Sequence, residues 1–304
     1  MVDKFHMTRH TLGILLVLQF GALAAHAESF GIYSGINQIS HQYLNNAVTS
    51  QEQAYGIKLD MQAYRRKPRG WLARGLKAHI QQSPNHLDLD VHTPLYQFHT
   101  HQGLWLALQW QQNSLSTVLT ENTLYMDESG NVVPLSSGDT LVLKRTFLRT
   151  QAYWYESVKD EGPINLLGIY YSVETSPASA DISTTNADIF DGRFSGFGFS
   201  LGRIKDDRGL NFQWRLNIAQ LTTDFSNDAT RHQTASSQES TVYHIDLKLE
   251  WHYRYYLSPY WYLVPNIRYQ YQSIFQTQLE PEYVNHPTFS FTQFSGAIEL
   301  KRYF

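Results

Sequence analysis

The stretch 241-TVYHIDLKLEWHYRYY-256 decides the fold of this chain of 304 residues, because its side chains alternate between two kinds. The odd positions are large and apolar or aromatic: Tyr243, Ile245, Leu247, Leu249, Trp251, Tyr253 and Tyr255. The even positions are ionisable: His244, Asp246, Lys248, Glu250, His252 and Arg254. A period of two residues is that of a β-strand with two different faces. Lipid suits the apolar face and a polar barrel interior suits the ionisable face, so we predict a transmembrane barrel strand.

The same alternation recurs along the chain. We predict strands at residues 30–38, 53–64, 71–81, 87–98, 104–111, 141–155, 164–173, 194–204, 209–218, 241–256, 259–275 and in a final strand that closes at Phe304. The expected fold class is therefore all-β, an antiparallel transmembrane β-barrel of 12 strands, with 10 or 14 as the alternatives.

Loop lengths support an even number of strands. Barrels of this kind have long external loops and short periplasmic turns. Long polar segments at 113–140, 176–191, 226–240 and 276–287 alternate with short connections such as Leu257-Ser258. One link departs from this pattern, because Ser83-Pro84-Asn85 is short where an external loop is expected.

The final strand ends in an aromatic residue, Phe304, after alternating apolar and polar positions from Phe294 to Lys301. This ending resembles the C-terminal signal of Gram-negative outer-membrane β-barrels. The resemblance implies a location in the cell outer membrane and contact with outer-membrane lipids. It also implies that the barrel assembly machinery is a partner during insertion, with Phe304 as part of the signal.

The first residues have the features of a secretory signal peptide. Lys4 and Arg9 precede an apolar run at 12–24, and Ala25-His26-Ala27 is a small-x-small cleavage site. We predict that residues 1–27 are a signal peptide and that 28–304 form the barrel. The alternative is an N-terminal membrane anchor, although the apolar run is too short to span a bilayer.

Composition limits the classes of partner. The formal net charge is −3, so no strongly basic surface points to nucleic acid. The aromatic share of 14% suits the rings that barrels place at membrane interfaces. There is no cysteine, so disulfides do not stabilise the fold. No motif indicates a cofactor, and a small polar solute is the expected ligand.

A first polar cluster is His86, Asp88, Asp90 and His92, which period-two geometry places on one face of a strand. Two imidazoles and two carboxylates can bind a divalent metal or share protons. Neighbours on that face are about 7 Å apart by rise, which is wide for ligands of one ion. They can equally be a charged lumen lining, and the sequence leaves the metal question open.

The lumen-lining candidates are inward-facing ionisable residues of several strands. They are Lys58, Asp60, His86, Asp88, Asp90, His92, Arg145, Arg149, Arg215, His244, Asp246, Lys248, Glu250, His252, Arg254 and Arg268. Five arginines of this set form a predicted basic ladder that favours anionic solutes. The carboxylates of the same set oppose it, so the sign of any selectivity stays open.

A mixed-charge lumen in a barrel of this size predicts a channel for passive passage of small hydrophilic or charged solutes. Two alternatives stay open: an outer-membrane enzyme acting on lipid or another surface substrate, and a structural or secretion-partner barrel without a pore. The sequence contains no His-x-Ser, the motif of the outer-membrane phospholipase A and lipid A deacylase families. We therefore predict no catalytic residues. Residues 125–133 are expected to form a hairpin that either projects outside or folds into the lumen.

Overall fold

The computed structural model describes most of the predicted barrel. Its described residues are 29–43, 46–62, 70–71, 75–99, 102–119, 122–126, 132–157, 164–175, 178–182, 185–190, 192–204, 209–225, 241–276 and 289–303. Residues 1–27, the predicted signal peptide, lie outside this set, as does Phe304. In the described part of the chain, no helix is long and apolar enough to cross a membrane.

The described elements are β-strands. They are β1 (Ser29–Tyr43), β2 (Asn46–Gln62), β3 (Gly70–Trp71), β4 (Gly75–Ser83), β5 (His86–His99), β6 (Gln102–Val118), β7 (Thr123–Met126), β8 (Val132–Leu135), β9 (Thr140–Ser157), β10 (Ile164–Thr175), β11 (Ala178–Ile182), β12 (Thr185–Phe190), β13 (Gly192–Ile204), β14 (Gly209–Phe225), β15 (Thr241–Ser258), β16 (Trp261–Gln276) and β17 (Phe289–Tyr303).

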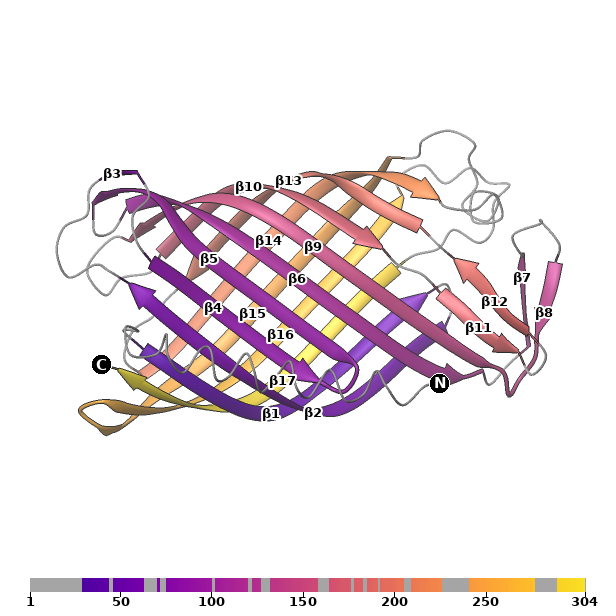
Figure 1. The fold of residues 1–304 in the computed structure, drawn as a ribbon, viewed down its shortest axis with the longest axis horizontal. Coiled ribbons are helices and arrows are strands. Elements are labelled where there is room, and N and C mark those ends of the chain that lie inside the picture. The colour runs from indigo at the N-terminus through magenta and orange to yellow at the C-terminus, as the bar shows by residue number, and fades with distance from the viewer. Residues whose placement is uncertain are drawn as a thin grey trace, which may run out of the picture.

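Twelve of these strands close into an antiparallel barrel, which confirms the predicted fold class and strand number for the described residues. Each barrel strand pairs with its barrel neighbours in the sequence, and the first strand closes on the last, with Ser29 opposite Tyr303 and Tyr43 opposite Phe289. Figure 1 shows the tilted strands wrapping around one axis, with β17 ending at the end opposite the β7–β8 hairpin.

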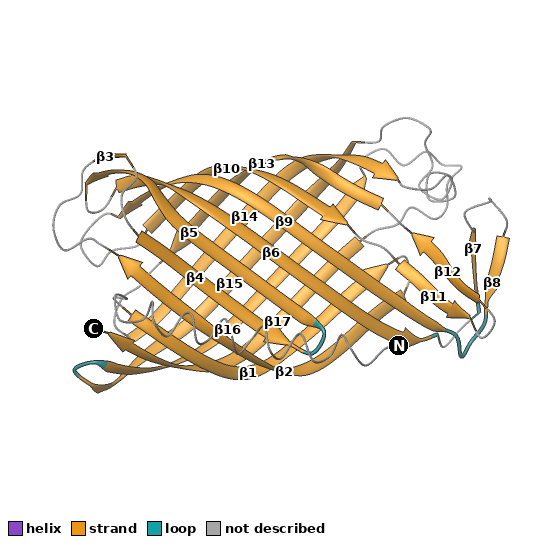
Figure 2. Cartoon of the chain, viewed as in Figure 1, coloured by secondary structure: helices purple, strands orange, loops and turns teal. Residues whose placement is uncertain are grey.

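Two connections differ from the expected pattern, and a third is the predicted hairpin. β15 continues to Ser258, so the turn is at Pro259-Tyr260 and not at Leu257-Ser258. The predicted loop 176–191 contains the β11–β12 hairpin, and β11 pairs with β9. The predicted hairpin at 125–133 exists as β7 and β8, which form a separate sheet at one end of the barrel (Figure 2).

The hairpin of β4 and β5 is shorter than its neighbours. It turns at Pro84-Asn85, so β2 pairs with β4 only from Tyr55 to Gln62. The rest of β2 continues past the hairpin tip, as Figure 1 shows for both β2 and β6. The short Ser83-Pro84-Asn85 link noted in the sequence is therefore a true tight turn that lowers one side of the barrel wall.

Most barrel strands are longer than a bilayer requires, and their side-chain pattern changes along their length. Strand β6 has 17 residues, against about 9–11 for a tilted membrane strand. Its outward side chains are apolar up to Trp110 and polar from Gln112 to Ser116. Its inward side chains change in the opposite sense, from Gln111 to Leu115. The outward face of β6 thus becomes polar near residue 112, whereas its inward face is polar from Gln109 to Asn113, between Ala107 and Leu115.

Other strands exchange faces at the same level. On β1 the outward Ile36 gives way to Gln38, while the inward Asn37 gives way to Ile39. Buried apolar residues of this end form one cluster, in which Leu119 and Leu135 join residues of the barrel strands: Ile39, Val48, Leu115, Leu119, Leu135, Leu141, Leu143, Tyr170, Phe194, Ala219, Leu221, Val242, Ile274 and Phe291. One half of the barrel is thus apolar outside and polar inside, as lipid requires. The other half has this buried apolar cluster inside, which we call the dry core, and polar side chains outside.

Candidate functional site: a charged chamber in the barrel lumen

A polar cavity of about 200 Å³ lies inside the membrane half of the barrel. Its acidic lining consists of Asp88, Asp90 and Glu250, and its basic lining of Arg215, Lys248 and Arg268, with His79 and His92 beside them. These residues come from five strands, β4, β5, β14, β15 and β16, whose inward positions share one level of the barrel. We call this cavity the charged chamber.

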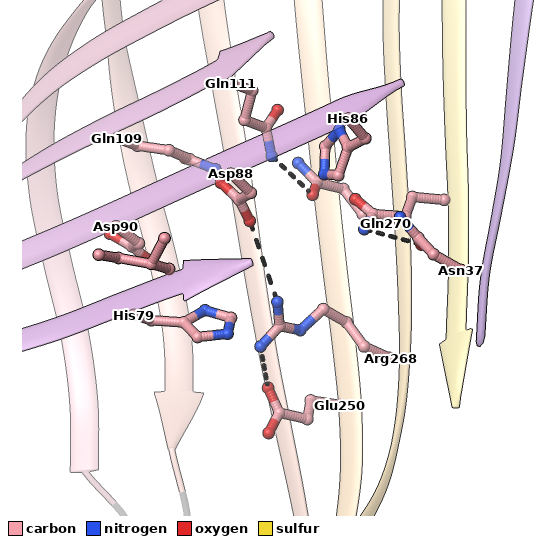
Figure 3. A network of polar contacts seen from close by, with 12 residues as sticks. Asn37, His79, His86, Asp88, Asp90, Gln109, Gln111, Glu250, Arg268 and Gln270 are labelled. Carbon is pink, nitrogen blue, oxygen red and sulfur yellow. Dashed lines mark hydrogen bonds and ion pairs between the residues drawn. The ribbon is translucent and has the colours of Figure 1, made fainter. Parts of the chain in front are cut away.

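Arg268 holds two carboxylates of the chamber together. Its Nη2 lies 3.4 Å from Oε2 of Glu250, which is the residue directly opposite on β15, and its Nη1 lies 4.0 Å from Oδ2 of Asp88 on β5. Figure 3 shows the guanidinium between the two acids, with His79 and Asp90 to its left in this view. The arginine therefore joins opposite walls of the barrel.

The two histidines of the chamber have tyrosine partners. His92 Nε2 lies 2.8 Å from Oδ1 of Asp90, and its Nδ1 lies 2.9 Å from the hydroxyl of Tyr153. His79 Nε2 lies 2.8 Å from the hydroxyl of Tyr33, which also donates to the carbonyl oxygen of Ile80 at 3.2 Å. Sequence reasoning missed both tyrosines, because it selected lumen residues by their charge, and only the inward position of each tyrosine on its strand identifies it.

Next to the chamber, toward the dry core, is a layer of buried amides and one ion pair. Arg149 Nη1 donates to Oδ2 of Asp246 at 2.7 Å, and both side chains are about 1% exposed or less. Gln270 donates to Oδ1 of Asp246 at 3.1 Å and accepts from Gln111 at 3.2 Å. The bonds of Gln111 and of Asn37 appear in Figure 3. These side chains cross the lumen and leave little of it accessible.

A second buried ion pair lies closer to the dry core. Arg145 donates to Glu174 through Nε at 2.6 Å and through Nη2 at 3.1 Å. Its guanidinium carbon lies 5.2 Å from the ring centroid of Phe147 and 4.8 Å from that of Phe291. Each charge of the pair has a partner, and aromatic rings cover the cation.

The structure divides the first polar cluster of the sequence. Asp88, Asp90 and His92 line the charged chamber, whereas His86 bonds to Asn113 and stacks with Phe291, away from it. Among the residues that the structure describes, no three His, Asp or Glu side chains are grouped so that they could hold a metal ion. The sequence cluster is one face of one strand, but a strand is too long for its ends to meet at one site.

The structure also divides the six ionisable residues at the even positions 244–254. His244 and Asp246 belong to the buried layers, and Lys248 and Glu250 belong to the chamber. His252 Nδ1 lies 3.7 Å from Oε1 of Glu250, and the Arg254 guanidinium lies 5.9 Å from the ring centroid of Tyr303. Lys58 pairs with Glu299 at 3.0 Å. Asp60 of β2 lies opposite Ser29 of β1, but the side chain of Asp60 is outside the described set.

The predicted basic ladder is largely neutralised. Arg145, Arg149 and Arg268 each have a carboxylate partner, at 2.6, 2.7 and 3.4 Å respectively. Arg254 lies against Tyr303. Of the five arginines, Arg215 alone lines the chamber without an ion pair to a described residue. The structure therefore replaces a continuous ladder with one local site.

The described lumen is closed on its way to the dry core. Asn37, Gln111, His244, Asp246 and Gln293 have no exposed surface, and the apolar cluster beyond them is equally buried. The described residues therefore do not form a lumen that is polar and open along its whole length. The sequence does carry a signal for this closure, because the apolar positions of β1 and β6 change phase along the strand.

A larger groove of about 780 Å³ lies beside the tip of the β4–β5 hairpin. Its apolar lining includes Ile32, Ile57, Ile80, Leu87 and Ile298, which are outward residues of the membrane half. Lipid chains fill such a groove on a membrane protein, so we regard it as part of the lipid-facing surface.

No family model matches the sequence, and no curated protein matches it. Solved structures of barrels do. The translocator domain of autotransporter NalP from Neisseria meningitidis aligns over 99% of this chain and 98% of its own, with 8% identity and a TM-score of 0.44. Outer membrane protease OmpT from Escherichia coli aligns over 91% and 97%, with 8% identity and a TM-score of 0.39. The Pseudomonas putida toluene transporter TodX aligns over 91% and 90%, with 8% identity and a TM-score of 0.32. At these values the similarities carry no argument about function.

The chain's own architecture establishes its class and place. A closed antiparallel barrel has no free edge, and its apolar outer band can only be satisfied by lipid. The protein is an outer-membrane β-barrel, and its location is the cell outer membrane.

Proposed function

We propose that the protein is a channel for small hydrophilic or charged solutes that is closed in this structure. The observation that supports this proposal is the charged chamber, a cavity of about 200 Å³ with both signs of charge inside the membrane half. A barrel with a purely structural role could fill this level with apolar side chains, as the dry core does. A cavity lined by ionisable groups suits a polar solute instead.

The dry core serves in this proposal as the gate. Hydrophobic constrictions close pores because water does not enter them, and charged solutes do not cross without water. Phe291 and Leu143, each 1% exposed, belong to this core and come from different strands, β17 and β9. The chamber is then the inner vestibule of the channel.

Single-channel recordings of the refolded mature chain test the proposal. The wild-type barrel is expected to be closed most of the time, and Phe291→Ala with Leu143→Ala is expected to raise the frequency and size of conductance steps. Phe294→Ala is the matched control, because Phe294 is on the same strand but faces outward and is 48% exposed. The control should behave as the wild type.

The other outcome supports a different role. A folded barrel that stays electrically silent, even with both core residues changed, contradicts transport. It would favour the structural or secretion-partner barrel, to which the filled lumen is also suited. Thermal unfolding of each variant in detergent verifies that silence does not come from a barrel that failed to fold.

A further inference from the structure

Arg215 and Lys248 face each other directly across the β14–β15 pair. Both line the charged chamber. Side chains at directly opposite positions of an antiparallel pair have Cβ atoms about 4.5–5.5 Å apart, and like charges there are destabilising. The barrel therefore holds two cations together on one wall of a cavity.

Two of the three carboxylates of the chamber form ion pairs with residues other than Arg215 and Lys248, although Asp88 and Asp90 also attract Lys248, and Asp90 attracts Arg215. Asp90 pairs with His92 at 2.8 Å, and Glu250 pairs with Arg268 at 3.4 Å. The remaining acid, Asp88, lies 4.0 Å from the same Arg268. By contrast, neither Arg215 nor Lys248 forms an ion pair with any residue that the structure describes.

Two adjacent cations without ion-pair partners match the chemistry of an anion site. The guanidinium presents a planar fork of donors to a carboxylate or phosphate, and the ammonium adds a compact charge with three donors. Removal of a cation from bulk water is costly, and the attraction of Asp88 and Asp90 offsets only part of that cost because neither acid is in contact with Arg215 or Lys248; an anion bound directly to both cations offsets more of it. The cavity of about 200 Å³ limits the ligand to a small one.

We propose that Arg215 and Lys248 form a binding site for a small soluble oxyanion, such as phosphate or a short carboxylate, in the charged chamber. Both residues face the lumen and not the lipid, so the ligand arrives as a free solute. The inference deepens the proposed function, because it names the solute class of the channel, but binding does not require that the channel opens.

Isothermal titration of the folded full-length barrel in detergent, with inorganic phosphate and separately with acetate, tests the site. At least one of the two is expected to bind the wild type. Arg215→Gln and Lys248→Gln should each weaken binding about tenfold, since each removes charge-assisted hydrogen bonds. Arg302→Gln is the matched control, because Arg302 is exposed and lies over Trp261 on the outer face. It should leave binding unchanged.

Thermal unfolding provides the second measurement. Phosphate or acetate should raise the unfolding temperature of the wild type but not that of the Arg215→Gln, Lys248→Gln double variant. Absence of binding to the wild type, or equal binding by the double variant, overturns the site. Neither result bears on conductance, so the site and the channel proposal can fail separately.

Discussion

The carboxylate of Glu52 holds the tip of the β4–β5 hairpin through Asn85. Its Oε1 accepts from the side-chain amide of Asn85 at 2.6 Å, and its Oε2 accepts from the backbone N–H of Asn85 at 3.1 Å. Glu52 lies on the part of β2 beyond its last pair with β4, Tyr55 opposite Gln82. The side chain therefore supplies the hydrogen bonds that a longer β4 would have made.

We expect Glu52→Ala to destabilise the hairpin tip. Removal of this charged acceptor takes the partner from three donors, the two of Asn85 and the hydroxyl of Ser50, a loss of about 1–3 kcal/mol. The amide hydrogen of Asn85 should exchange faster with solvent, and the unfolding midpoint in urea should fall. The control is Gln51→Ala, a neighbouring outward and exposed position. Unchanged exchange at Asn85 would contradict the role given to Glu52.

We expect Asp246→Asn to be strongly destabilising, by about 3–5 kcal/mol, because it leaves the Arg149 cation buried without its charged partner. The double change Arg149→Met with Asp246→Leu should recover much of that loss, since it removes both charges. Urea unfolding of Arg149→Met, of Asp246→Leu and of the double variant measures the coupling. Additive losses would show that the two residues do not act as a pair.

The ring of Tyr33 packs directly against the backbone of Gly56, where there is no room for a Cβ. A Cβ at residue 56 would lie 2.1 Å from the Tyr33 hydroxyl oxygen and 2.3 Å from the carbonyl oxygen of Ile80. We expect Gly56→Ala to displace Tyr33 from His79 and to cost about 1–3 kcal/mol. A Cβ at Gly296 meets nothing within 4 Å, so Gly296→Ala is a neutral control. Equal unfolding free energies of Gly56→Ala and Gly296→Ala would contradict the role given to Gly56.

The exchange of faces along β6 predicts where the membrane ends. Leu108 lies in the lipid-facing band and Ser116 lies beyond it on the same outward face. Leu108→Arg should cost about 2–4 kcal/mol of folding free energy in bilayers, whereas Ser116→Arg should cost about 0–1 kcal/mol. Folding titrations in lipid vesicles compare the two. A larger loss for Ser116→Arg than for Leu108→Arg would show that we have assigned the membrane to the wrong level of β6.

The alternating sequence by itself predicted the barrel strands, twelve of them with 10 or 14 as alternatives, and the two faces of each strand, because a period of two is a local property of an extended chain. From that alone, 241-TVYHIDLKLEWHYRYY-256 is a barrel strand with six inward ionisable side chains. Its partners do not follow, since Arg149 meets Asp246 across the lumen from a position 97 residues away.

Only the tertiary structure decided which of these side chains meet. Strand register placed Arg215 opposite Lys248, and barrel closure brought Asp88 to Arg268 while leaving His86 against Phe291. It also stacked the inward apolar residues of many strands into one core that closes the lumen. Alternation shows which face of the strand a side chain is on. Its height in the barrel and its neighbours on other strands depend on register and closure, which are properties of the whole sheet.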